Sequence, residues 1–424
     1  MPRLPSLTLI VGFTIAATAQ AADNDGLSLP PGFQATVVHE GVGFARHVAI
    51  RDNGDLYVAT RQPPFVREDP SKNIGIVALR DTNSDGKADV VEHFSEVRGT
   101  GLQFYKGMLY ASNDVAVYRF RFKADELVPK AAPETVIEGF VQERQHADKP
   151  FAFDGNGHIY VNVGAPANAC QEKDRTPGSP GKRPCPLLER YGGIWQFNAE
   201  KTEQSQVADG TRYATGLRNA VALEWNSQAD ALFVVMHGRD QLDTLWPQLF
   251  TAEANAERVA EEMHVIRQGG NYGWPYTYFD VKRGIRMLGP EYGGDGKTPA
   301  EPGKYADPLV AFPAHWAPND IIFYEGSAFP ESYRGGAFIA FHGSWNRAPL
   351  PQAGYKVVFV PFKDGKPSGE WQVFADHFAS DPLQDNSPAN AERRPVGLAV
   401  AADGSLYITD SVNGRIWRVT YAGT

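Results

Sequence analysis

Short runs of alternating apolar and polar residues recur along the chain, and each is followed by a turn and a second such run. The clearest example is residues 394–410, in which Asp403-Gly404 separates two apolar-alternating stretches. A period of two indicates half-buried strands, and Asp-Gly supplies the positive backbone angles of a tight hairpin. The pattern occurs six times, each time with an aromatic anchor in its second strand: Tyr57, Tyr110, Tyr160, Phe233, Phe338 and Tyr407.

The six anchors lie about 50 to 105 residues apart. Repeats of this length, each built from four short strands, are typical of the blades of a β-propeller. We therefore predict an all-β, six-bladed β-propeller; the alternative is a large β-sandwich whose hairpins are similar by chance. Residues 33–38 read as an extra strand, which we expect to close the ring by pairing with the last blade.

The N-terminus has the features of an export signal. Arg3 is followed by an apolar run over residues 7–17 and by Ala19-Gln20-Ala21, an A-x-A cleavage motif. We expect a signal peptide at 1–21, a single mature domain at 22–424, and a periplasmic or secreted location. The apolar run is too short to span a membrane, and the net charge of −9 argues against a nucleic-acid partner.

The chain has two cysteines, Cys170 and Cys185. In an oxidising compartment we expect them to form a disulfide around a polar loop; the alternative is a metal or redox pair. The chain has no C-x-x-C-H motif, so no c-type haem is attached and electrons would have to pass to a separate acceptor.

Residues 81–92 match the ligand spacing of a calcium loop, which we place between the first and second blades. Oxygen-bearing side chains stand at positions 1, 3, 5, 9 and 12, with Gly86 at position 6. The alternative is a polar hairpin that binds no ion. The candidate calcium ligands are Asp81, Asn83, Asp85, Asp89 and Glu92.

Polar residues precede the inner strand of several predicted blades, where a propeller presents side chains to one mouth of its channel. An arginine-rich mouth suits a ligand with several carboxylates, because guanidinium groups bind carboxylates through two parallel hydrogen bonds. A histidine there can act as a general base. The alternative is that these are structural or surface residues. The candidates are Arg46, His47, His146, Arg218, Asn219, His315, Asn319 and Arg394.

Several phrases of the sequence resemble one known family. They lie at residues 146–164, 213–219, 271–275, 333–338, 341–347 and 394–397. With them the chain resembles the soluble quinoprotein sugar dehydrogenases, most closely the L-sorbosone dehydrogenase-like branch, over nearly all of the mature chain. It departs from that branch at Lys149, around Asn319-Asp320 and in the loop after Gly238.

The resemblance implies a propeller that binds pyrroloquinoline quinone and Ca²⁺ at the channel mouth. It implies that His146 is the base, that Arg218 polarises a quinone carbonyl beside Asn219, and that Arg394 and Arg347 hold cofactor carboxylates. Backbone carbonyls of Gly238 and Arg239 would bind the calcium ion. Arg46 and Trp345 are further candidate cofactor contacts, although Trp345 could instead pack between blades.

These observations favour a quinone-dependent dehydrogenase that oxidises a sugar or a related aldehyde or alcohol and passes electrons to a separate cytochrome or quinone. A metal-dependent propeller lactonase is a second hypothesis, disfavoured by the arginine- and histidine-rich mouth. A non-catalytic ligand-binding propeller is the third.

Overall fold

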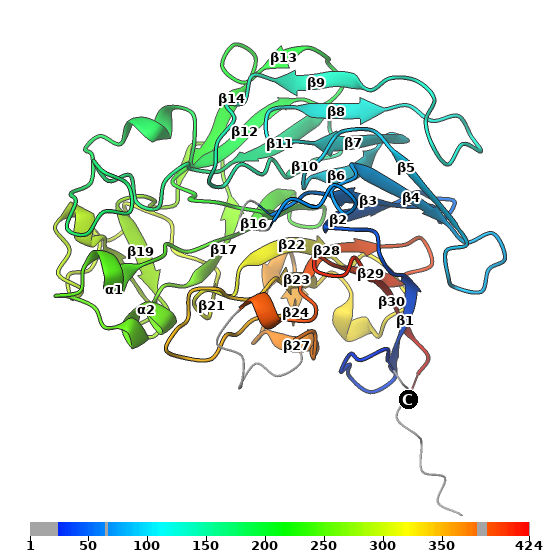
Figure 1. The fold of residues 1–424 in the computed structure, drawn as a ribbon. Helices are drawn as coiled ribbons and strands as arrows, with labels where there is room; N and C mark the ends of the chain where they lie inside the picture. The colour runs from blue at the N-terminus through cyan, green and yellow to red at the C-terminus, as the bar shows by residue number, and fades with distance from the viewer. Residues whose placement is uncertain (1–23, 64–66, 380–387, 424) are drawn as a thin grey trace, which may run out of the picture.

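The computed structural model describes residues 24–63, 67–379 and 388–423, and its six larger sheets, of four or five strands each, are arranged in a ring (Figure 1). The predicted six-bladed β-propeller is confirmed. Each blade has four antiparallel strands and starts with an inner strand, and each predicted repeat supplies the first two strands of one blade.

The first three blades differ in how far they are extended. Blade 1 consists of β2 (Ala45–Ile50), β3 (Leu56–Thr60), β4 (Ile76–Arg80) and β5 (Val90–Phe94). Blade 2 consists of β6 (Leu102–Tyr105), β7 (Met108–Ser112), β8 (Val117–Phe120), β9 (Glu134–Glu138) and the parallel addition β13 (Gln204–Ser205). Blade 3 consists of β10 (Phe151–Phe153), β11 (His158–Val163), β12 (Gly193–Asn198), β14 (Thr211–Thr215) and the parallel addition β18 (Gly270–Asn271).

The last three blades each have four strands. Blade 4 consists of β15 (Ala222–Asn226), β16 (Ala231–Met236), β17 (Glu261–Ile266) and β21 (Val310–Phe312). Blade 5 consists of β22 (Pro318–Phe323), β23 (Ala337–Phe341), β24 (Lys356–Val360) and β27 (Gln372–Ala375). Blade 6 consists of β28 (Pro395–Val400), β29 (Leu406–Asp410), β30 (Ile416–Tyr421) and β1 (Phe33–His39).

Strand β1 closes the ring as predicted. It pairs antiparallel with β30, with Phe33 opposite Tyr421, so the two ends of the chain lie in one sheet. Phe33 also packs edge-on against Phe329 and Phe374 of the neighbouring blade. The last blade is therefore completed by an outer strand that is distant in sequence from its other three strands.

The aromatic anchors pack between neighbouring blades. Tyr57 is fully buried against Phe104 of blade 2, and its hydroxyl donates to the carbonyl of Leu127 at 2.8 Å. Tyr110 likewise reaches the next blade, where it donates to the carbonyl of Ala199 at 2.9 Å. Each anchor thus fills the space between two sheets, which explains why a large apolar ring recurs at this point of the repeat.

An insertion in blade 4 carries both α-helices of the described chain and lies to one side of the ring (Figure 1). It contains α1 (Leu242–Leu245), α2 (Ala252–Arg258) and the hairpin β19 (Thr277–Asp280)–β20 (Ile285–Leu288). The alanine- and glutamate-rich run at 251–263 predicts a helix, but α2 ends at Arg258. From Glu262 the backbone pairs with β16 instead, so strand pairing ends the helix early. A smaller hairpin, β25 (Phe362–Lys363)–β26 (Lys366–Pro367), extends blade 5.

The candidate calcium loop lies in a different place from the predicted one. It joins β4 to β5 within blade 1 and does not link blades 1 and 2, because β5 pairs with β4 as the outer strand of the same sheet. Glu92 is exposed on β5. The predicted signal peptide at 1–21 lies outside the described residues. Among the described helices, none is long and apolar enough to cross a membrane.

Candidate functional site

The loop before β10 places His146 at the mouth of the channel, close to the segment before β15. Its backbone is in the left-handed region with φ 51°, which a non-glycine residue adopts only when its surroundings hold it there. Gly164 makes this packing possible. A Cβ at Gly164 would lie 2.7 Å from the Cβ of His146 and 2.8 Å from the Oδ1 of Asn219.

The imidazole of His146 is held as a neutral base. Its Nδ1 lies 2.5 Å from the backbone carbonyl of Ala165, which can only accept a hydrogen bond, so Nδ1 carries the proton and Nε2 keeps its lone pair. Burial, reinforced by the positive charge of Arg218, lowers the pKa of His146 to about 3. His146 is therefore unprotonated at neutral pH, as a proton acceptor must be.

Arg218 is 3% exposed and is surrounded by oxygen atoms. Its Nη1 donates to the Gly238 carbonyl at 2.9 Å, and its Nη2 donates to Asn168 Oδ1 at 3.1 Å and to Asp240 Oδ2 at 2.6 Å. Its Nε is buried without a hydrogen-bond partner in the described chain. A buried donor without a partner is costly, so an acceptor that reached this N–H would be stabilised.

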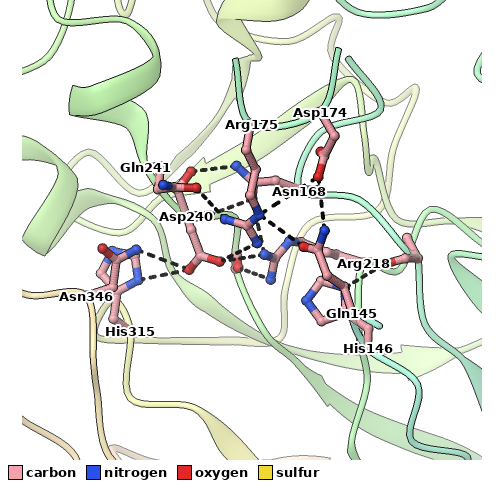
Figure 2. A network of polar contacts seen from close by, with 12 residues as sticks. Gln145, His146, Asn168, Asp174, Arg175, Arg218, Asp240, Gln241, His315 and Asn346 are labelled. Carbon is pink, nitrogen blue, oxygen red and sulfur yellow. Dashed lines mark hydrogen bonds and ion pairs between the residues drawn. The ribbon is translucent and has the colours of Figure 1, made fainter. Parts of the chain in front are cut away.

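Asp240 is the centre of the polar network around Arg218 (Figure 2). Besides Arg218, its carboxylate lies 3.4 Å from Arg175 Nη2 and 3.7 Å from His315 Nδ1, and it accepts a hydrogen bond from Asn346 at 3.3 Å. Arg218 is the main neighbour that holds the pKa of Asp240 well below its usual value, against the opposing effect of burial. The carboxylate is therefore ionised and balances part of the positive charge.

Arg175 extends this network toward the disulfide loop. Its guanidinium donates to the side-chain oxygens of Gln145 and Gln241. Cys170 and Cys185 form the predicted disulfide and pack against Trp274. The Trp274 indole donates to the backbone carbonyl of Asn168 at 2.9 Å. The cysteine-bounded loop is therefore a wall of the site and not a remote surface loop.

The other predicted cofactor arginines lie around the same mouth but are tied to protein groups. Arg46 donates to Thr100 and lies 3.6 Å from Asp148. Arg394 donates to the carbonyls of His342 and Gly343 at 2.9 and 2.7 Å. Burial lowers the pKa of His342, and the positive charges of Arg394 and Arg46 lower it further, so both guanidinium groups lie near that histidine.

The loop after β23 contributes Trp345 and Arg347. Trp345 is 56% exposed, so it does not pack between blades. Its neighbour Asn346 bonds Asp240, which places the loop beside the network. Arg347 donates to the backbone carbonyls of Ala256 and Ala314 and so joins this loop to the blade 4 insertion.

Asn219 and the predicted calcium carbonyls lie next to Arg218. Asn219 is buried, and its Oδ1 accepts from Asn162 at 3.3 Å. The Gly238 carbonyl is bonded to Arg218. The side chain of Arg239 points away into a buried pair with Glu291, at 2.5 and 2.9 Å.

The carboxylates of the 81–92 loop accept hydrogen bonds from the loop's own backbone. Asp81 accepts from the N–H groups of Ser84 and Gly86, and Asp89 accepts from Thr82. Over the described ranges, no group of three or more His, Cys, Asp or Glu side chains is placed to hold a metal ion. Calcium binding by this loop stays a prediction.

The residues at the mouth fit an acidic, oxygen-rich cofactor such as a tricarboxylated quinone. The buried and unpartnered Nε of Arg218 is a donor that a quinone oxygen could satisfy. Arg46, Arg347 and Arg394 are further arginines predicted for this site, and guanidinium groups bind carboxylates; the exposed Trp345 offers an aromatic face. Network residues that the sequence did not indicate include Asn168, Arg175 and Asp240; the one sequence signal for Asp240 was an acidic residue directly after Gly238-Arg239.

Comparison with known proteins places this geometry in a family. A family model described as TrAA12-like matches residues 27–422. The chain belongs to the TrAA12-like family. This result confirms the predicted relationship to quinoprotein sugar dehydrogenases, whereas the sorbosone-type branch stays a prediction.

Sequence relatives of this TrAA12-like chain match only part of their own length. A pyrroloquinoline quinone-dependent pyranose dehydrogenase of Coprinopsis cinerea is 33% identical over 276 residues, which are 57% of this chain and 36% of that protein. An uncharacterized protein of Borreliella burgdorferi is 28% identical over 223 residues, 52% of this chain and 50% of that protein. The matched regions thus span half or less of these relatives.

Solved structures share the propeller of the TrAA12-like chain. The holo form of the PQQ domain of the Coprinopsis cinerea pyranose dehydrogenase aligns with a TM-score of 0.71 and 18% identity, covering 93% of this chain and 97% of that one. The calcium structure of a Trichoderma reesei AA12 enzyme aligns with a TM-score of 0.73 and 19% identity, covering 96% and 99%. At these identities the likeness shows the fold.

Proposed function

We propose that this protein is a quinone-dependent sugar dehydrogenase that uses pyrroloquinoline quinone. The observation that carries the proposal is the pairing of His146, a neutral base with a free Nε2, with Arg218, a buried cation with an unpartnered Nε. The relationship to a pyrroloquinoline quinone-dependent pyranose dehydrogenase supports the cofactor. A pyranose or a related aldehyde or alcohol is the proposed substrate.

Oxidation of a sugar hydroxyl to a carbonyl removes a proton from oxygen and a hydride from carbon. In the proposed reaction, His146 Nε2 accepts the proton, because the Nδ1–H bond to Ala165 fixes the tautomer. Pyrroloquinoline quinone, when bound, supplies the two-electron acceptor. Arg218 and Asn219 would donate to its carbonyl oxygens, and Arg394, Arg347 and Arg46 would attract its carboxylates beside Trp345.

Electrons would then leave to a separate acceptor, a cytochrome or a quinone. We propose a periplasmic or secreted location, which is supported by the signal-like N-terminal sequence and by the Cys170–Cys185 disulfide. Both features are expected of a protein that works in an oxidising compartment.

The test combines cofactor binding with turnover. Pyrroloquinoline quinone and Ca²⁺ are added to purified protein, binding is followed by the absorbance of the quinone, and dye reduction is measured with a panel of pyranoses. His146→Asn should bind the quinone with unchanged affinity but lose roughly 10²–10⁴-fold in dye reduction, the usual contribution of a general base. His158→Asn is the matched control, because His158 is exposed on β11 and its imidazole pairs with nearby Asp154.

Unchanged turnover in His146→Asn would refute the assignment of the base. Absence of quinone binding by the wild-type protein would refute the proposed function and favour a ligand-binding propeller without this chemistry.

A further inference from the structure

Two side chains from blades that are not neighbours meet inside the ring. Gln103 lies on β6, the inner strand of blade 2, and Glu224 lies on β15, the inner strand of blade 4. The Nε2 of Gln103 lies 3.5 Å from the Oε1 of Glu224. Because blade 3 stands between these two blades, the contact passes on the channel side of β10, which is the shortest of the six inner strands.

An ionised Glu224 would leave this contact half made. The Oε1 of Gln103 is buried without a hydrogen-bond partner in the described chain. A carboxylate can only accept hydrogen bonds, so it could bond the amide N–H but not the amide oxygen. A protonated carboxyl has an O–H donor for that oxygen, while its other oxygen accepts from Nε2. The neutral acid therefore satisfies both ends of the amide with two parallel hydrogen bonds.

The surroundings of Glu224 also favour its neutral form. Within the described ranges no Lys, Arg or His forms an ion pair with it. Burial, followed by the negative charges of Asp320 and Glu325 on blade 5, raises the pKa of Glu224 to about 8. His47 of blade 1 is directed at Asp320, 3.7 Å away.

The remaining elements packed against Glu224 supply no compensating charge. Strand β10 has no ionisable side chain, and the residue opposite Glu224 on β16 is Phe233. A carboxylate at this position would be buried without a cation, which is costly.

We propose that Glu224 is held as a neutral carboxylic acid and forms a two-bond clasp with Gln103 across the channel, a clasp that opens when the carboxyl ionises. This inference does not rest on the proposed function. Ionisation removes the O–H donor, leaves the Gln103 oxygen without a partner again, and places a negative charge beside Asp320 and Glu325. The clasp braces blades 2 and 4 around the short strand β10, which follows the loop of His146.

The first experiment measures denaturant unfolding of wild type and Glu224→Gln between about pH 5 and pH 8. Native Glu224 keeps a proton that the unfolded chain releases above its ordinary pKa of 4.5. This residue should therefore lower the wild-type folding constant by up to about tenfold per pH unit as the pH rises. Glutamine pairs with Gln103 at every pH, so the ratio of the Glu224→Gln constant to the wild-type constant should increase at least about tenfold over this range.

Glu138→Gln is the matched control, because Glu138 is exposed on β9. Its ratio to wild type should stay constant over the same range. A constant ratio for Glu224→Gln as well would overturn the inference, since Glu224 would then be ionised in the folded protein as in the unfolded chain.

The second experiment tests the clasp itself. The infrared carbonyl stretch of the protonated Glu224 carboxyl, identified by its loss in Glu224→Gln, is followed against pH in wild type and in Gln103→Met. The Nε2 contact is long at 3.5 Å, so we expect the O–H bond to dominate and its loss to move the titration midpoint down by at least about half a pH unit. An unchanged or higher midpoint would show that Gln103 does not accept from the acid, and would refute the clasp.

Discussion

Neutralising Asp240 tests whether the network around Arg218 stabilises the protein. The change Asp240→Asn keeps the shape and a hydrogen-bond acceptor but removes the charge opposite Arg218, whose Nη2 lies 2.6 Å from the carboxylate. Removing one partner of a buried ion pair costs about 3–5 kcal/mol because the remaining charge is left uncompensated. The asparagine still accepts a hydrogen bond, so we expect the lower end, about 3 kcal/mol.

The assay is thermal unfolding at neutral pH. For a chain of this size each kcal/mol changes Tm by about 2 °C or slightly less, so the expected decrease is about 4–6 °C. Asp209→Asn is the matched control: Asp209 also lies 2.6 Å from a cation, Lys201, but Lys201 is 56% exposed. Solvent screens such a surface pair, so the control should unfold close to the wild-type temperature.

Equal unfolding temperatures for wild type, Asp240→Asn and Asp209→Asn would refute this reasoning. They would mean that the buried network contributes no more than a surface pair. A second readout separates stability from positioning: quinone-loaded Asp240→Asn should lose turnover even well below its unfolding temperature, because Arg218 is no longer held toward the mouth.

Three further outcomes are expected. The pKa of His146 is lowered to about 3 from 6.5, so below about pH 6.5 the unfolded chain binds a proton that the native imidazole does not. The free energy of unfolding should therefore fall by up to about 1.4 kcal/mol for each pH unit below this value. In urea unfolding at pH 7 and at pH 5, His146→Asn should lose less of this free energy than the wild-type protein. Gly164→Ala places a methyl group 2.7 Å from His146 and 2.8 Å from Asn219 Oδ1. This overpacking should lower the free energy of unfolding by about 1–3 kcal/mol, measured by denaturant unfolding, and should reduce quinone affinity, measured by titration. Wild-type values in both assays would contradict the packing. Replacing Cys170 and Cys185 together by serine should cost about 3 kcal/mol on denaturant unfolding, since their loop spans 15 residues, and unchanged stability would show that the loop is held without the bond.

The blade hairpins could be predicted because their signals are local. Alternation with a period of two, an Asp-Gly turn and an aromatic anchor all lie within about twenty residues, as at Tyr407 and its turn at Gly404. The pairing of β1 with β30 was also predictable, since a propeller needs its ring closed. The end of α2 could not be predicted from the sequence, because the interaction that competes with the helix is the pairing of Glu262 with β16.

The candidate site divides in the same way. His146, Arg218 and Arg394 were found because they occupy equivalent positions before inner strands. Asp240, Asn168 and Arg175 were missed, because their importance arises from side chains that meet across loops far apart in sequence. Asn168 and Asp240, for example, exchange hydrogen bonds across 72 positions.

The sequence by itself determined the six-fold repeat and the closure of the ring, because repeated local patterns encode blades and blades share one geometry. Only the tertiary structure decided which oxygen atoms surround Arg218, which nitrogen of His146 is free, and that the Asp81 loop lies within blade 1. Those properties depend on distances of 2.5–3.5 Å between segments that no local pattern relates.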